Sequence, residues 1–253
     1  MFFIPLSLLI GVSILLSTET ASSQAANPEL KGDYVVLLHG LGRTSASMKR
    51  LEYFFKEHGY RVVNLNYPST RFSVEELAGV YLDAQLRQTI SDPAVRIHFI
   101  THSLGGIILR QYLSNHTIQN LGRVVMIAPP NHGSDLIDHL RTSALARKLL
   151  GPGALELGTD PNAILNHLGP LDFQCGVIAG DRSLNPFFSR LLKGPNDGKV
   201  TVESARVDGM WDFLVLHSSH TWLAWRQQTL DQTLCFLESG HFSRNGKPTK
   251  HAI

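Results

Sequence analysis

The sequence is poor in cysteine, with two in 253 residues, and two cysteines cannot form a disulfide framework. A hydrophobic fraction of 43% instead supports a substantial buried core. Cys175 lies in a predicted interior strand and Cys235 on the apolar side of a predicted C-terminal helix, where a free cysteine behaves as a small hydrophobe. We expect two buried thiols, although export would permit a bridge between them.

Several motifs are also missing. The sequence has no H-E-x-x-H, no Cys/His cluster and no G-x-G-x-x-G opening a helix, so we predict no cofactor, neither a metal nor a nucleotide. The net charge is only +2 and no Lys/Arg run is present, which argues against nucleic acid as a partner. Because no Pro/Gly/Ser-rich linker divides the chain, we predict one domain over 27–253.

The first segment lacks charge. Residues 2–16 form an apolar run that leads into small residues, and Ala25 or Ala26 could end a signal peptide there. The run is shorter than the roughly 18 to 20 residues of a membrane span, but it also lacks a basic n-region, so a retained anchor is the alternative. We interpret 1–26 as a signal peptide or membrane anchor, and expect a protein secreted or held in the cell envelope (periplasm).

Strand and helix patterns alternate along the rest of the chain. Apolar runs of strand length are followed by segments with helical periodicity, among them a helix capped by Ser45 and one opened by a capping box of Ser73 and Glu76. This alternation predicts an α/β fold with a doubly wound, mainly parallel sheet and helices on both faces. The predicted strands are 33–39, 61–66, the strand that ends before Ser103, 122–127 and 173–178.

The strand before Ser103 runs into a tight turn and then a helix that opens with two glycines. A sharp strand-to-helix elbow of the form G-x-S-x-G exposes a serine hydroxyl beside a base, which is the arrangement of a nucleophile. Here Thr101 replaces the first glycine of that motif. The pentapeptide alone therefore leaves two interpretations open: a nucleophilic serine, or a serine in an ordinary βα loop.

A serine nucleophile also needs a histidine base and a carboxylate that orients it, in the chain order Ser, acid, His. Downstream of Ser103 the chain offers Asp181, directly after the fifth predicted strand, and Asp197 in a turn of composition Asn-Asp-Gly. The candidate bases are His217 and His220. His241 and His251 lie in a polar tail and are expected to face solvent.

Five segments together are similar to the α/β-hydrolase lipases and esterases, in the right order, over roughly residues 32 to 240. The resemblance is greatest to the bacterial lipase branch related to the GPI inositol-deacylase-like hydrolases. It implies an α/β-hydrolase fold. It also favours a nucleophilic Ser103 over a serine in an ordinary loop, because five linked motifs are far more specific than one elbow. The segments are 36–41 (VLLHGL), 101–106 (THSLGG), 128–134 (APPNHGS), 196–200 (NDGKV) and 219–221 (SHT).

By position, the resemblance implies a triad of Ser103, Asp197 and His220. It places the oxyanion hole at the backbone N–H groups of Leu41 and Leu104.

Asp181 is the alternative acid, because the loop after this strand carries the acid in many members of the fold. His217 is expected to be a loop histidine bonded to the backbone, and His102 a packed or hydrogen-bonding elbow residue. We expect His39 to brace the oxyanion loop and His132 to shape the pocket wall or its turn.

Residues 135–172, between the fourth and fifth strands, are rich in leucine and predict a pair of short helices. They stand where such hydrolases build a cap. An apolar cap would suit an acyl chain, and helices that merely cover the sheet are the alternative.

These observations predict a serine ester hydrolase, a lipase or carboxylesterase, that works through an acyl-enzyme on a lipid or small acyl ester. The N-terminal leader makes association with a membrane a further expectation, either peripheral or through that segment. An acyltransferase on the same triad and a catalytically inactive binding protein on a hydrolase fold are the alternatives.

Overall fold

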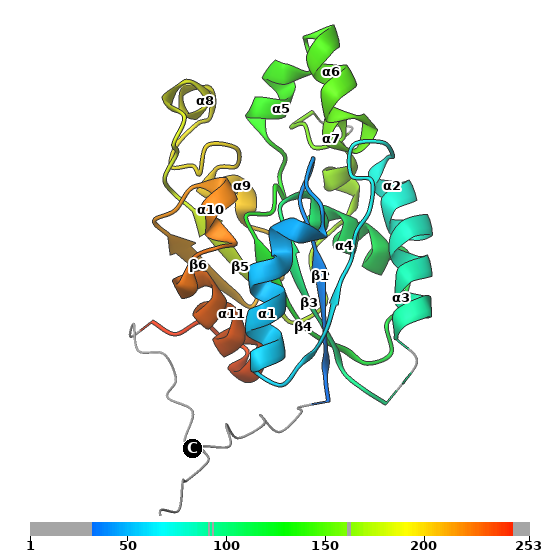
Figure 1. Ribbon diagram of the computed structural model, residues 1–253. Coiled ribbons are helices and arrows are strands. Elements are labelled where there is room, and N and C mark those ends of the chain that lie inside the picture. The colour runs from blue at the N-terminus through cyan, green and yellow to red at the C-terminus, as the bar shows by residue number, and fades with distance from the viewer. Residues whose placement is uncertain (1–31, 91, 93, 161–162, 245–253) are drawn as a thin grey trace, which may run out of the picture.

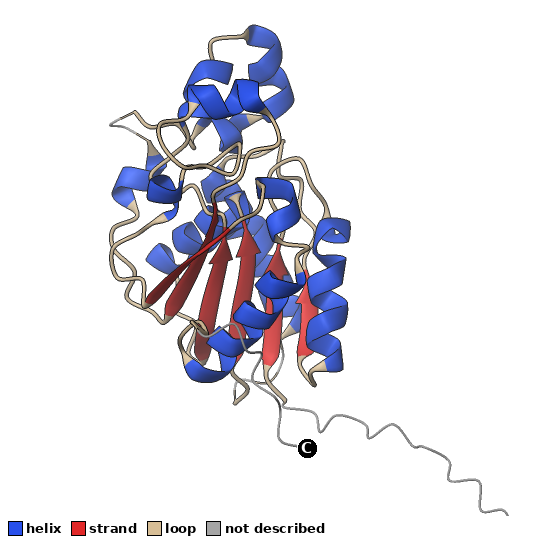
Figure 2. Cartoon of the chain, turned by 90° about the vertical axis from the view of Figure 1, so that its left-hand side faces the viewer, coloured by secondary structure: helices blue, strands red, loops and turns tan. Residues whose placement is uncertain are grey.

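The computed structural model describes residues 32–90, 92, 94–160 and 163–244, so the predicted leader and the tail that holds His251 lie outside it. Six parallel strands form one sheet in the order β2-β1-β3-β4-β5-β6 (Figure 2). The strands are β1 (Tyr34–Leu38), β2 (Arg61–Asn64), β3 (Ile97–His102), β4 (Leu121–Ile127), β5 (Cys175–Gly180) and β6 (Asp212–Leu216). The predicted α/β-hydrolase fold with a doubly wound parallel sheet is confirmed.

Apolar residues alternate along the central strands and face opposite sides of the sheet, because successive side chains in a strand point in opposite directions. Val35 and Leu37 of β1 lie in the cluster under α1 (Lys49–Glu57) and α11 (Gln227–Ser239). Val36 and Leu38 lie in the cluster on the other face. That face is covered by α2 (Val74–Glu76), η2 (Leu77–Leu82), α3 (Asp83–Thr89), α4 (Leu104–Asn115) and α9 (Val202–Ala205) (Figure 1).

The short helices between β4 and β5 lie beyond the carboxyl ends of the strands (Figure 1). The described part of this insertion forms three α-helices and a 3-10 turn, so the prediction of a pair of helices was wrong. Gly151 and Pro152 separate the first two from the third, because the Gly151 backbone has a φ of 78° that continues no helix. The elements are α5 (Asp135–Leu140), α6 (Ala144–Leu150), α7 (Pro152–Leu155) and η3 (Ile164–His167).

Other boundaries also differ from the prediction, and the second strand ends at Asn64 instead of residue 66. The helix after β1 begins as a 3-10 turn, η1 (Ser45–Met48), and its N-cap is Thr44 rather than Ser45. The fifth strand is shifted by two residues toward the C-terminus, since Gly180 still pairs with Leu216 of β6. The capping box of Ser73 with Glu76 is present as predicted.

The remaining helices are α8 (Pro186–Leu191) and α10 (His220–Leu223). Both cysteines are buried free thiols, one in β5 and one in α11. Among the helices that the structure describes, none combines the length and the apolar character that crossing a bilayer requires.

Candidate active site

Ser103 lies at the turn between β3 and α4 and has a φ of 54°, a left-handed conformation that costs a non-glycine residue energy. The turn is held on both sides: the Ser103 N–H donates to the carbonyl of Ile127 over 2.9 Å, and the N–H of Gly106 donates to the Ser103 carbonyl over 2.9 Å. The strained backbone therefore belongs to a fixed, sharp elbow of the kind that exposes a serine hydroxyl.

Glycines beside Ser103 are required by close packing of the backbone. A Cβ on Gly105 would lie 2.6 Å from the carbonyl oxygen of Leu38, so α4 can approach β1 only without a side chain there. A Cβ on Gly40 would lie 3.2 Å from the Cβ of Ser103. By contrast, Thr101, which replaces the first glycine of the motif, is fully buried and its Oγ1 has no hydrogen-bond partner.

Asp197 and His220 form a buried hydrogen bond, with 2.7 Å between Oδ2 and Nδ1. Their side chains are 1% and 6% exposed, so water does not compete for this contact. The other carboxylate oxygen, Oδ1, accepts from the N–H groups of Lys199 and Val200 over 2.9 and 2.8 Å. An aspartate that accepts three hydrogen bonds is fixed in direction, and so is the imidazole that it holds.

The two loops that carry this pair are joined through their backbones. The N–H of His220 donates to the carbonyl of Asp197 over 3.0 Å, so the loop after β5 and the start of α10 are directly bonded. Gly180 at the end of β5 makes room for them, because a Cβ there would lie 2.5 Å from the Ser218 carbonyl oxygen and 2.9 Å from the Asp197 Cβ.

His102 lies beside His220, with 4.9 Å between ring centroids, and its Nε2 bonds to the His220 carbonyl over 3.0 Å. Burial is the main cause that lowers the pKa of His102 well below its usual range, and the nearby His220 lowers it further. A neutral His102 with its proton on Nε2 donates this hydrogen bond. His102 is therefore a hydrogen-bonding elbow residue, as the sequence analysis expects.

Leu41 and Leu104 follow β1 and β3 at the same edge of the sheet. Leu104 is the residue directly after Ser103. Within the described part of the chain, neither of their backbone N–H groups donates a hydrogen bond to another residue. Leu104 is the first residue of α4, where N–H groups lack an intrahelical acceptor. Leu41 and Ser103 line one pocket.

The loop that carries Leu41 is fixed by His39, which is fully buried. Its ring stacks on Tyr67 with 4.0 Å between centroids, the Tyr67 hydroxyl donates to the His39 carbonyl, and the Tyr67 N–H donates to the His39 Nε2. Gly42, next to Leu41, donates its N–H to the Ser69 hydroxyl over 3.0 Å. These contacts agree with the bracing role expected for His39.

One pocket of about 190 Å³ contains Ser103 and His220 together, although no hydrogen bond joins these two side chains in the described structure. Its far wall is apolar and is built by the insertion between β4 and β5. The wall residues from this insertion are Leu136, Ile137, Leu140, Leu150 and Leu157.

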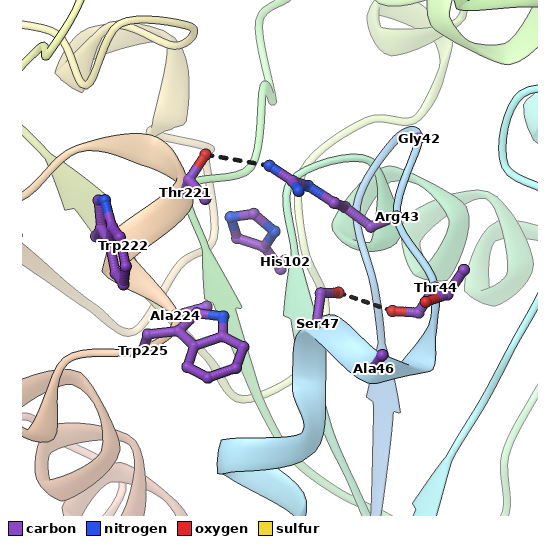
Figure 3. A pocket seen from close by; sticks show the side chains of 10 residues that line it. All are labelled: Gly42, Arg43, Thr44, Ala46, Ser47, His102, Thr221, Trp222, Ala224 and Trp225. Atoms are coloured by element: carbon purple, nitrogen blue, oxygen red, sulfur yellow. Dashed lines mark hydrogen bonds between the residues drawn. The ribbon is translucent and has the colours of Figure 1, made fainter.

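A second pocket of about 500 Å³ adjoins the first, because His102, Arg43 and Thr221 line both (Figure 3). Its side walls include Trp222 and Trp225, and Figure 3 shows Arg43 reaching across His102 toward Thr221. Within the described residues, no cluster of three His, Cys, Asp or Glu side chains could hold a metal ion.

Comparison with known proteins decides the family. Residues 35–243 match the model of the alpha/beta hydrolase family. The chain belongs to this family. No curated protein sequence matches it.

Solved structures share the fold of this alpha/beta hydrolase at low sequence identity. A mature Bacillus licheniformis lipase, BlEst2, is 21% identical, with a TM-score of 0.70 over 84% of this chain and 94% of that one. The Legionella pneumophila phospholipase PlaB is 22% identical, with a TM-score of 0.58 over 75% and 53%. A metagenomic carboxyl esterase, MGS0156, is 19% identical, with a TM-score of 0.57 over 76% and 65%.

The hydrolase contains a second His–Asp pair, formed by His217 and Asp181, the alternative base and acid of the sequence prediction. His217 Nδ1 lies 2.9 Å from Asp181 Oδ1, but these side chains are 72% and 33% exposed. His217 was expected to bond to the backbone, and its ring instead bonds to this carboxylate. Neither residue lines the pocket of Ser103, whereas His220 does.

One further prediction concerns His132 of the hydrolase, and two pocket residues were not predicted. His132 is exposed and lies in the turn after β4, where its N–H donates to the Ser204 carbonyl over 3.0 Å. Arg43 and Lys199, which both line the pocket of Ser103, were not predicted as site residues. Their only sequence signal is position: Arg43 directly follows HGLG, and Lys199 lies within the segment 196–200.

Proposed function

We propose that this alpha/beta hydrolase is a serine ester hydrolase, a lipase or carboxylesterase, with Ser103, Asp197 and His220 as its triad. The observation that carries the proposal is the buried Asp197–His220 hydrogen bond of 2.7 Å, whose histidine shares a pocket with the strained Ser103. A hydrolase fold alone does not specify the reaction, so the function is argued from these side chains.

The reaction proceeds in two steps. His220 takes the hydroxyl proton of Ser103 while the oxygen attacks the ester carbonyl, and it then passes that proton to the alcohol as the ester bond breaks. A water molecule attacks the acyl-serine in the same way and releases the acid. Asp197 holds the imidazole in the required tautomer, since its Oδ2 accepts the Nδ1 proton.

Negative charge forms on the carbonyl oxygen during both steps. The N–H groups of Leu41 and Leu104 are the donors proposed for this oxyanion. Leu41 lines the pocket of Ser103, Leu104 is the next residue in the chain, and neither N–H has another acceptor in the described chain. The apolar wall of the pocket takes the acyl chain of the ester. Export through the N-terminal segment would bring such an enzyme to lipid substrates of the envelope.

Labelling with a fluorophosphonate probe tests the mechanism, because the probe requires an activated serine. We expect the wild-type protein to be labelled and to hydrolyse p-nitrophenyl butyrate, and Ser103→Ala to lose both. Ser114→Ala is the matched control, since Ser114 lies near the far end of the same helix and its hydroxyl bonds to the Gln111 carbonyl. Labelling of Ser103→Ala at the wild-type level would contradict the assignment of the nucleophile.

A further inference from the structure

Two basic residues line the pocket that holds Ser103 and His220. Arg43 comes from the loop after β1 and also lines the neighbouring tryptophan pocket, and Lys199 comes from the loop after β5. In the described structure neither pocket has an aspartate or glutamate in its lining. Two cations thus face the catalytic serine without a carboxylate among the residues that surround them.

Neither cation forms an ion pair with a described residue. The Arg43 guanidinium makes one long hydrogen bond of 3.4 Å, to the Thr221 hydroxyl. Asp197 lies two residues before Lys199, but its oxygens already accept from the His220 ring and from two backbone N–H groups. The donors of both cations are therefore available to a ligand.

The two positive charges act on each other. Arg43 and Lys199 are both exposed to solvent, but atoms packed around the Lys199 ammonium lower its pKa by partial desolvation. Arg43 lowers that pKa further, while Asp197 acts in the opposite direction. After burial and His220, Lys199 and Arg43 also lower the pKa of His102. The charges thus lie close enough to repel, and an anion placed between them would relieve this repulsion.

We place the alcohol part of the ester beside Arg43. His220 has to reach the leaving oxygen to return a proton, and Thr221, which holds Arg43, is the next residue. Figure 3 shows the Arg43 side chain directed across His102 to this threonine. The apolar residues of the insertion line the same pocket and suit the acyl chain.

We propose that Arg43 and Lys199 form an anion subsite that binds a phosphate or carboxylate in the alcohol part of the substrate. This inference rests on the proposed ester hydrolysis. The substrate class is then an ester between an apolar acid and an anionic alcohol. Arginine can bind either anion with two parallel hydrogen bonds, and lysine adds a point charge.

The test uses esters with the same acyl chain and different charge on the alcohol. One pair is 2-nitrophenyl octanoate and 3-nitro-4-octanoyloxybenzoate, which differ by a carboxylate, and the other is octanoylglycerol and octanoylglycerol 3-phosphate. We expect wild-type kcat/KM to be at least about tenfold higher for the anionic member of one pair, with the ratio falling as salt rises. The pair with the larger ratio identifies phosphate or carboxylate.

Variants assign this preference to the two cations. Arg43→Gln and Lys199→Met should each lower the anionic-to-neutral ratio about tenfold, as expected when a hydrogen bond between charged groups is lost. Lys193→Met removes the same charge from an exposed residue in the loop before Asn196, outside both pockets, and should keep the wild-type ratio.

The outcomes separate this proposal from the function on which it rests. A wild-type enzyme that hydrolyses the neutral esters with no anionic preference overturns the proposed substrate subsite and leaves the ester hydrolase intact. Failure to hydrolyse any of the four esters overturns the proposed function itself. Inhibition by inorganic phosphate is the last measurement. Suppose that phosphate inhibits competitively, that Arg43→Gln abolishes this inhibition, and that no anionic ester is preferred. The site then binds a free anion, and the substrate assignment is wrong.

Discussion

At the scale of single residues, burial separates two His–Asp pairs that have nearly the same geometry. The distances are 2.7 Å for His220–Asp197 and 2.9 Å for His217–Asp181. Only the first pair is shielded from water, and electrostatic interactions are stronger where water is excluded. A carboxylate that orients a histidine in a low-dielectric site can stabilise the imidazolium that forms during catalysis, whereas an exposed pair gains little.

This contrast gives a prediction about the acid. Asp197→Asn should lower kcat by roughly three to four orders of magnitude, because the asparagine amide favours the wrong imidazole tautomer. Asp181→Asn is the matched control and should change kcat by less than about twofold, since its pair is exposed and outside the pocket of Ser103. Steady-state hydrolysis of p-nitrophenyl butyrate, with circular dichroism to check folding, measures both. The reverse ranking would move the acid of the triad to Asp181.

At the scale of elements, the insertion between β4 and β5 combines the two interpretations that the sequence leaves open. Leu140 and Leu150, from α5 and α6, line the pocket of Ser103. Leu165 and Leu171, further along, are buried in the cluster that covers the sheet. The insertion is anchored at the Gly153 N–H, which donates to the Phe72 carbonyl over 3.0 Å. One part thus shapes the pocket and the other belongs to the core.

The pocket wall predicts a dependence on acyl chain length. Burial of each methylene contributes up to about 0.8 kcal/mol, so kcat/KM should rise from acetate to butyrate to octanoate p-nitrophenyl esters. Leu140→Ala and Leu150→Ala should each lower the octanoate-to-acetate ratio about threefold or more, because the chain loses apolar contacts. Leu145→Ala is the control: Leu145 lies on α6 but is 68% exposed and outside the pocket lining.

A ratio that falls from acetate upward would contradict an acyl site at this wall. An effect of Leu145→Ala as large as that expected of Leu150→Ala would also contradict it, since the contact would then lie on the exposed face of α6.

Elements with a strong local pattern were predictable, and short ones at the edges were not. Buried strands such as β1 read as continuous apolar runs, and the Ser73–Glu76 capping box marks its helix start by itself. The sixth strand, β6, was missed. It is a five-residue edge strand whose apolar run, 213–216, is only four residues long, and its Val215 is 39% exposed. The helices of four to seven residues between β4 and β5 are too short to establish a period.

At the scale of the whole molecule, the parallel sheet brings together residues that are far apart in the chain. Leu41, Ser103, Asp197 and His220 follow β1, β3, β5 and β6, and the carboxyl ends of these strands share one edge. Motif order alone was therefore enough to predict that they meet. Which loop side chains turn into the pocket depends on packing between distant loops. The two cations and the second His–Asp pair were for this reason visible only in the structure.

The packing of the whole molecule also predicts how its stability depends on pH. Burial lowers the pKa of three histidines, His39, His98 and His102, below the usual value near 6.5. For His98 the effect of burial outweighs that of the Asp33 carboxylate, which lies 3.5 Å from Nε2 and raises the pKa. Below the unfolded pKa, the unfolded chain binds protons that the folded chain does not, so stability is lost as pH falls. Stability is fully present above about pH 7.

Each such histidine contributes a slope of up to about 1.4 kcal/mol per pH unit below the unfolded pKa, and three together give up to about 4. We expect urea unfolding to show a falling free energy from pH 7.5 to pH 5.5. In His98→Gln the free energy of unfolding at pH 7.5 should be lower. Its slope with pH should fall by up to about 1.4 kcal/mol per pH unit, because glutamine does not titrate. A free energy that is flat over this range, or a slope that His98→Gln leaves unaltered, would show that the buried imidazoles do not set the acid limit of the fold.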